Sequence, residues 1–349
     1  MKGVRGFSQN NSNRHFNEKM CLSLCPLGKI DGYIRTCFKI ILVFFLLGIA
    51  AINNGCEKDL EWEESSQGGQ LVLFSFLSPD SVFSVHLSKS VSHSSVDDFE
   101  RVYEGNITVY KNGVIADDFI FPFDKSWTFR DDISLKTGDT VRVEAADGDG
   151  ERVFAETVIP DAVGIEVVDT AVVQQATRDN GTETVLQCLL NIDDPEGEDN
   201  YYQLIVFEQI CRNGLSSACE ETKIDYAKED PVFYVRNLEG SLIGGLDFGG
   251  CFSDHIFEGT NYELTLNLPV QYASAPSDPG ADRKLLFILL SHKREYYDYY
   301  RSRVVAEYGY DLPIIDPIRI YNNVNNGIGL VAGYSAAADS LIFENGNTP

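Results

Sequence analysis

The sequence predicts a mainly β protein with one helix, and three observations lead to this prediction. Apolar and polar residues alternate with a period of two along most of the chain, turn signals interrupt the pattern at short intervals, and one stretch has helical spacing. Residues 70–160 are expected to form an immunoglobulin-like β-sandwich. A second β-rich domain is expected over residues 161–335, and a C-terminal tail over residues 336–349.

The first 55 residues are interpreted as a signal peptide for export. They carry seven basic and two acidic side chains, and Ile40–Ile52 is a run of about 13 apolar residues. This length is typical of the core of a signal peptide and is shorter than the ~20 residues that span a bilayer. The methionines are Met1 and Met20, and the pattern fits a start at Met20 better than one at Met1.

Cys56 follows the apolar run and Gly55, which resembles the lipidation site of a bacterial lipoprotein. The sequence therefore predicts acylation of Cys56 and anchoring in the outer-membrane lipid, because two or more acyl chains hold a protein firmly. The alternative is a soluble export signal that is cleaved nearby, with Cys56 as an ordinary thiol.

Residues 56–69 are expected to form a lipidated acidic tether. Its first charged side chains resemble the surface-export signal of Bacteroidota lipoproteins, which predicts a location on the cell surface. These side chains are Glu57, Lys58, Asp59 and Glu61. Charged segments of this kind are also commonly solvated linkers, and the two interpretations are compatible.

The formal charge of the whole chain is −25. Removal of residues 1–55 takes away seven bases and two acids, which leaves −30 for the mature protein. Such a surface has no basic patch for phosphates, so we expect no nucleic-acid partner. It is also repelled by anionic membrane, so the lipid would have to provide the attachment.

The predicted sandwich has clear strand and turn signals. Phe83–Ser88 alternates apolar with polar residues, as a half-buried strand does. Asn112 and Gly113 separate two apolar runs, which predicts a hairpin because both positions of a type I′ turn need φ > 0. Further strands are expected at 140–145 and 152–159, each after a turn rich in Gly and Asp.

Five more strands and the helix are expected in the second domain. The strands are Gly164–Gln174, Val185–Ile192, Tyr201–Ile210, Tyr262–Leu268 and Lys284–Leu290. Leu285–Leu290 is apolar throughout, which indicates a central strand covered on both faces. The helix is expected at about residues 292–307, because Ser291 is a candidate N-cap and Tyr296, Tyr300 and Val304 share one stripe.

Four cysteines follow Cys56, an even number in a chain bound for an oxidising compartment. Cys211 and Cys219 flank a short polar loop, so we expect them to be bridged. A bridge between Cys188 and Cys251 is then possible, but the sequence does not choose among the three connectivities.

Two further clusters are candidate binding sites. Five carboxylates lie close together in one loop and are a weak Ca²⁺ candidate, although the EF-hand spacing is missing and a solvated turn is the simpler interpretation. They are Asp193, Asp194, Glu196, Glu198 and Asp199. The helix carries four tyrosines, which form either a core stripe or a platform on which a sugar, a peptide or a flat cofactor stacks. They are Tyr296, Tyr297, Tyr299 and Tyr300.

The chain has no recognisable catalytic motif, and no cofactor is expected. Walker, HExxH and GxSxG patterns are missing, and Gly327–Gly333 differs from a dinucleotide fingerprint in the place of its last glycine. We therefore expect a protein that is not an enzyme. A surface hydrolase that uses paired carboxylates is the less favoured alternative.

The order of motifs resembles the DUF4249 family of Bacteroidota outer-membrane lipoproteins. The motifs after Cys56 are Leu77–Ser81, Phe83–Ser90, Thr108–Gly113, Ala155–Pro160, Asp194–Tyr202, the tyrosine-rich helix and Asn322–Gly329. The resemblance implies a surface lipoprotein that serves a TonB-dependent transporter as an accessory ligand-binding or gating subunit. The alternative is a structural or assembly component of an outer-membrane complex, and in either case the ligand is unknown.

Overall fold

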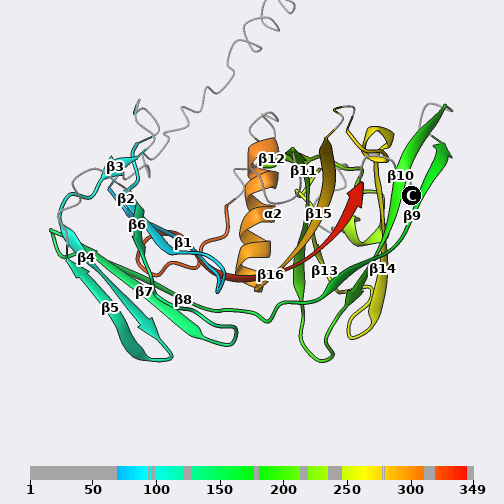
Figure 1. The fold of residues 1–349 in the computed structure, drawn as a ribbon. Helices are drawn as coiled ribbons and strands as arrows, with labels where there is room; N and C mark the ends of the chain where they lie inside the picture. Colours follow the sequence, from blue (N-terminus) through cyan, green and yellow to red (C-terminus); the bar gives the residue numbers. More distant parts are fainter. Residues whose placement is uncertain are drawn as a thin grey trace, which may run out of the picture. The chain divides into compact units, whose positions relative to one another are not determined.

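The computed structural model describes residues 69–92, 95, 99–120, 128–176, 181–212, 219–234, 246–276, 278, 280–309 and 319–343. These residues form three β-sheets and the helix α2 (Arg294–Gly309), which confirms the mainly β prediction (Figure 1). Two short 3-10 helices, η1 (Pro231–Phe233) and η2 (Val270–Tyr272), lie in the connections. No helix in the described ranges is long and apolar enough to cross a membrane.

The largest sheet has nine strands. Its order is β12 (Cys219–Ile224), β11 (Tyr201–Arg212), β15 (Ala281–His292), β16 (Ile328–Phe343), β1 (Leu71–Leu77), β2 (Phe83–Lys89) and β3 (Glu100–Arg101), while β13 (Cys251–Ser253) pairs with β11 and β6 (Thr128–Asp131) with β2. The first and last strands of the described chain, β1 and β16, pair in parallel, and Leu73 lies opposite Gly329. The sheet thus joins segments from both ends of the described chain.

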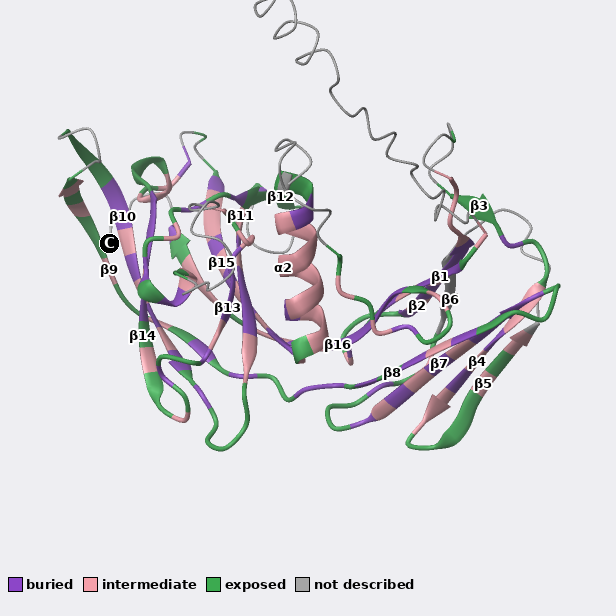
Figure 2. Ribbon diagram, turned by 180° about the vertical axis from the view of Figure 1, so that it is seen from behind, coloured by how far each residue is buried: buried purple, intermediate pink, exposed green. Residues whose placement is uncertain are grey.

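The two smaller sheets each pack on part of this large sheet. One has the order β5 (Val114–Ile120), β4 (Gly105–Lys111), β7 (Thr140–Asp147), β8 (Arg152–Val158). The other has the order β14 (Asn261–Pro269), β10 (Thr182–Asp193), β9 (Ile165–Ala176). Figure 2 shows buried residues along strands of both smaller sheets.

The first core lies between β1, β2 and the four-stranded sheet. Leu73 and Phe83 from the large sheet meet Ile107, Val143 and Ala155 from the other layer, and all are essentially inaccessible to solvent. Buried residues recur at every second position of these strands, as Val141, Val143 and Ala145 do on β7, and this is the alternation from which the sandwich was predicted. Val331 of β16 also belongs to this core, so the sandwich includes a strand from outside the predicted range 70–160.

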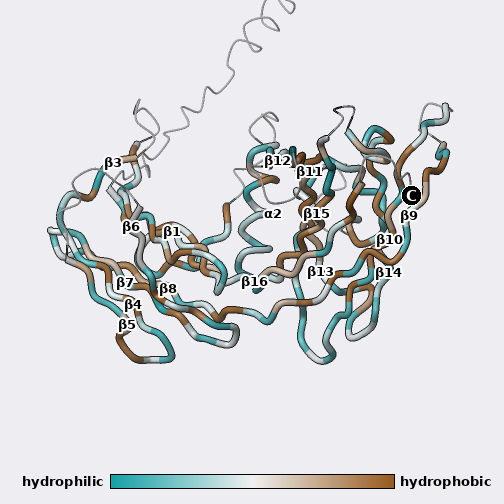
Figure 3. Tube along the Cα trace, in the orientation of Figure 1, coloured by the Kyte–Doolittle hydropathy of each residue, from teal (hydrophilic) through white to brown (hydrophobic). Residues whose placement is uncertain are grey.

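The second core lies between β11, β15 and the three-stranded sheet. Tyr202, Leu204, Phe287 and Leu289 face Leu190 and its neighbours there. The apolar runs of β11 and β15 are visible in Figure 3. Apolar burial of this extent is the main stabilising contribution to such a core, at roughly 25 cal/mol per Å² removed from water.

Local signals placed most elements correctly. Asn112 and Gly113 have φ values of 52° and 79° and join β4 to β5, as the hairpin signal predicts. The helix extends from Arg294 to Gly309, close to the predicted 292–307.

Two predictions near the C-terminal end differ from the structure. Ser291, the candidate N-cap, lies in β15 and accepts a hydrogen bond from the Val163 N–H, and the helix begins three residues later. β16 continues to Phe343 and pairs with β15 as far as Arg283, so residues 336–343 are strand and not tail. The run Ala336–Ala338 is small and carries no β-branched residue, and its pairing with β15 decides its conformation.

Candidate functional site

Several tyrosines of α2 pack against strands of the large sheet. The ring centroid of Tyr297 lies 4.9 Å from that of Tyr201 on β11, and Tyr297 is only 9% exposed. Tyr296 stacks on His292 with a centroid distance of 3.9 Å, and its hydroxyl donates to Gln203 Oε1 at 3.2 Å. These two rings therefore fix the helix to β11 and β15, which is the core role that the sequence left as one alternative.

The tyrosine cluster continues onto β1. Phe76 meets Tyr296 edge to face at a centroid distance of 5.9 Å, and Phe74 meets Tyr299 in the same way at 5.9 Å. Phe76 is 40% exposed and Tyr299 is half-buried, so part of this cluster is open to solvent. We call Phe74, Phe76, Tyr296, Tyr299 and Tyr300 the aromatic surface.

A turn over residues 246–250 also packs against α2. The guanidinium of Arg301 lies over the rings of Phe248 and Tyr297, at 4.9 and 5.0 Å from their centroids. Gly249 has a φ of 61°, and a Cβ at this position would overlap the hydroxyl of Tyr300. A glycine is needed here both for the backbone conformation and for the close approach of the helix.

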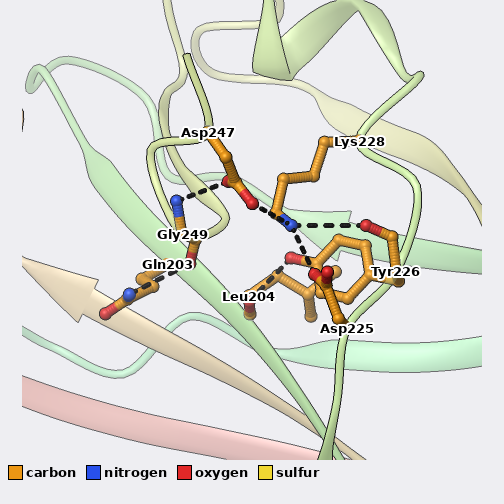
Figure 4. Close-up of polar contacts among 7 residues, drawn as sticks. All are labelled: Gln203, Leu204, Asp225, Tyr226, Lys228, Asp247 and Gly249. Atoms are coloured by element: carbon orange, nitrogen blue, oxygen red, sulfur yellow. Dashed lines mark hydrogen bonds and ion pairs between the residues drawn. The ribbon is translucent and has the colours of Figure 1, made fainter. Parts of the chain in front are cut away.

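Lys228 holds this turn to the chain segment before η1 (Figure 4). Its ammonium lies 2.7 Å from Asp247 Oδ2 and 3.0 Å from Asp225 Oδ1, and it sits 4.6 Å from the centroid of the Tyr226 ring. Burial lowers the pKa of Lys228, but the hydrogen bonds and charges of the two aspartates outweigh burial and raise it overall. Lys228 is thus a fixed positive charge, held between two carboxylates.

Neighbouring hydrogen bonds connect this network to β11. Tyr226 donates its hydroxyl proton to the Leu204 carbonyl at 2.7 Å, and Gln203 Nε2 donates to the Gly249 carbonyl at 3.1 Å (Figure 4). Because Gln203 also accepts from Tyr296, one buried amide links the turn to α2. Nothing in the sequence pointed to Lys228, because its partners come from both sides of the stretch 235–245.

His292 is the most unusual polar group beneath α2. It is buried, and neither ring nitrogen has a hydrogen-bond partner in the part of the chain that the structure describes. Burial lowers the pKa of His292 to about 3, so the imidazole is neutral. A neutral ring stacked on Tyr296 acts here as a packing group, at the cost of an unpaired N–H.

The acidic loop is built differently from the predicted solvated turn. Asp194 is buried, and its two carboxylate oxygens accept hydrogen bonds from the Tyr202 hydroxyl and, at 2.7 Å, from the Gly259 N–H. Asp254 is also buried and accepts from the Asn200 N–H at 2.7 Å. Burial raises the pKa of Asp254 to about 6, and the negative charge of Asp194 adds to this effect.

The other carboxylates of the calcium candidate are not buried with this pair. Asp193, Glu196 and Asp199 are exposed, and Glu198 forms an ion pair with Lys293 at 3.3 Å. Within the described ranges, no group of three or more His, Cys, Asp or Glu side chains is arranged to hold a metal ion.

The structure resolves the question of cysteine pairing. Cys211 and Cys219 form a disulfide between directly opposite positions of β11 and β12, as predicted. Cys188 and Cys251 are free and buried in this structure, not bridged, and burial raises the pKa of both thiols to about 12. Neither thiol is reactive near neutral pH, because the thiolate is the nucleophilic form.

The predicted lipidation and export residues Cys56, Glu57, Lys58, Asp59 and Glu61 lie outside the described residues. Among the described residues, the aromatic surface is the part of the candidate site that is suited to bind a ligand. Exposed ring faces beside guanidinium groups can stack on a sugar face, a peptide side chain or another flat group.

The chain is similar to a known protein family. The profile of a family described as "Domain of unknown function (DUF4249)" matches residues 57–340. No curated protein matches the sequence.

Proposed function

The chain belongs to the DUF4249 family, and from this premise we propose that it is a surface-exposed outer-membrane lipoprotein that serves a TonB-dependent transporter as an accessory ligand-binding subunit. In this proposal acylated Cys56 provides the anchor, and the folded residues that follow it capture a ligand or present it to the barrel. The protein acts by binding, without turnover.

The observation that carries the proposal is the aromatic surface shared by α2 and β1. Phe76 of β1 and Tyr299 of α2 leave ring area open to solvent. In the same surface the guanidinium of Arg303 lies over the ring of Tyr300, which stacks on Tyr296. Stacked rings with nearby cations form a surface suited to sugars, peptides and flat groups.

The place of this surface in the chain also supports the proposal. β1 begins at Leu71, 15 positions after Cys56. A chain of this length spans at most roughly 50 Å when fully extended. A ligand bound beside β1 would thus stay within reach of a barrel in the same membrane.

The proposal is tested by gentle detergent extraction of native outer membranes from cells in which this protein carries a C-terminal tag. We expect a TonB-dependent barrel to co-purify in a stoichiometric amount, and deletion of the gene to reduce uptake by that barrel. The proposal fails if no barrel co-purifies and deletion leaves uptake unchanged. Recovery of assembly components in place of a barrel would favour a structural role.

Two matched variants test the aromatic surface itself. Phe76→Ala removes a ring that is 40% exposed, and Val114→Ala removes a side chain that is 69% exposed on the hairpin between β4 and β5. Both are surface truncations, so neither should unfold the protein. We expect uptake to fall in the Phe76 variant and to remain normal in the Val114 variant.

A further inference from the structure

β9 is an edge strand in the described part of the chain, where β10 is its only ladder partner. It pairs with β10 on one side, and the three-stranded sheet ends with it (Figure 1). Along residues 168–176 both faces of the strand are exposed or half-buried. An edge of this kind is a ready template for pairing with another chain.

Two hydrogen bonds show which N–H groups of β9 point away from β10. The Val167 N–H donates to Asp339 Oδ2 of β16 at 2.8 Å, and the Thr170 N–H donates to the side chain of Asp169 at 2.8 Å. The register of β9 and β10 shifts by one residue between these positions. With a period of two beyond Thr170, the N–H groups of Val172 and Gln174 point to the same open side.

Aspartates therefore block the outward N–H groups of Val167 and Thr170, whereas those of Val172 and Gln174 have no hydrogen-bond partner among the residues that the structure describes. Aspartates also cap the N–H of Asp118 on β5 and of Ser340 on β16, at 2.7 Å in each case. Such capping is one way in which natural edges are blunted. On β9 it stops at Thr170, and the unprotected part carries Val172, which is 55% exposed.

The charge near this edge selects the kind of partner. β9 and β10 carry Glu166, Asp169, Glu183 and Asp193 and no lysine or arginine. A second copy of the chain would bring the same carboxylates to the edge, and each copy has a formal charge of −25. Like charges across a strand pair are destabilising, whereas opposite charges stabilise it.

We propose that the open edge of β9, from Thr170 to Ala176, binds an extended segment of a partner protein in which basic residues alternate with β-branched apolar ones. The segment would add a strand beside β9, with main-chain hydrogen bonds to Val172 and Gln174 and with its basic side chains near Asp169 and Glu183. Strand addition of this kind takes affinity from the backbone and specificity from alternate side chains. It does not depend on the proposed role in transport.

The test uses the full chain in detergent and a fluorescent ten-residue peptide in which lysine alternates with valine and threonine. We expect the peptide to bind, as measured by fluorescence anisotropy, and to bind more weakly as salt is added. Val172→Pro should weaken binding at least about tenfold, because it removes one outward N–H and opposes the added strand. Val172→Thr retains the N–H and is the matched control, with binding close to that of the wild type.

Proline is tolerated at the outward positions of edge strands, so both variants should keep the melting temperature of the wild type. If Val172→Pro unfolds the protein, the double variant Asp169→Asn and Glu183→Gln tests the charge instead, and it should weaken binding and reduce its salt dependence. The proposal is overturned if the proline variant binds the peptide as tightly as the wild type. It is equally overturned if a peptide with glutamate in place of lysine binds as well, or if sedimentation shows a dimer of this chain that Val172→Pro dissolves.

Discussion

The parallel pairing of β1 with β16 makes one glycine critical for stability. Gly329 lies opposite Leu73 with a φ of 132°, a conformation that side chains other than hydrogen rarely adopt. A Cβ at this position would overlap the carbonyl oxygen of Leu73. Leu73 is fully buried and also pairs with Leu87 on β2, so β1 has no room to withdraw.

The cost of Gly329→Ala follows from these contacts. The backbone strain alone is on the order of 1–3 kcal/mol. Overpacking against a fixed backbone costs about 1–3 kcal/mol more. We therefore expect the free energy of unfolding to fall by about 2–6 kcal/mol, which is a large effect for one methyl group.

Gly138→Ala is the matched control for this substitution. Gly138 also has a positive φ, at 81°, but no heavy atom lies within 4 Å of a Cβ built there. Its loss should be limited to the conformational strain of about 1–2 kcal/mol. The comparison thus separates the close approach of β1 to β16 from the cost of the backbone conformation.

Urea unfolding followed by far-ultraviolet circular dichroism measures both variants, with equal slopes required for the comparison. If Gly329→Ala lowers stability no more than Gly138→Ala does, the close pairing of β1 with β16 is refuted. The conclusion that β16 completes the first core would then fail with it.

Three further predictions follow from the structure. Tyr297→Ala should lower the free energy of unfolding by about 3–5 kcal/mol because the ring is buried, whereas Phe76→Ala should cost less than half of that, as urea titrations would show. The pKa of Asp254 is raised to about 6, so the protonated carboxyl contributes its full stability below the pKa of the unfolded chain, and this stability is lost as pH rises through 6. Asp254→Asn should remove this pH dependence and stabilise the protein at pH 8 by on the order of 2 kcal/mol, as thermal unfolding at several pH values would show. Replacing Cys211 and Cys219 together by serine should cost about 2–3 kcal/mol, since the bridge closes a short loop, and peptide mapping of the wild type without reduction should recover the linked pair.

The sequence was sufficient for those elements whose signals are local. Alternation along Phe83–Lys89 reports a strand with one buried face, and the Asn112 and Gly113 pair reports a turn that few other residues adopt. The boundary of the first sandwich could not be read in this way, because the strand that completes it is β16. No pattern within residues 70–160 indicates that a strand from the other end of the chain pairs with Leu71–Leu77.

The candidate site shows the same division between local and distant information. The tyrosine stripe of α2 was visible from its spacing, but the choice between core and surface depends on Phe76 and Tyr201, which are far away in the sequence. The acidic loop was interpreted as solvated because its composition is polar. Asp194 is nevertheless buried, and its carboxylate accepts a hydrogen bond from the N–H of Gly259, 65 residues further on. The composition of a segment predicts only the average exposure of its residues. Whether a single carboxylate is buried depends on partners that lie far away in the sequence.

β1 takes part in the first core and in the aromatic surface, and it is joined to the second core through β16 and β15. If Cys56 is acylated as proposed, β1 is the first described strand to receive a force from the membrane, and it is held by β2 on one side and by β16 on the other. β16 in turn pairs with β15, whose Phe287 lies in the second core. Pulling β1 out would therefore break two ladders along their length and expose apolar residues such as Leu73. A strand in that position is suited to transmit load without local unfolding, and the rings of Phe74 and Phe76 on its other face keep α2 attached to the same strand.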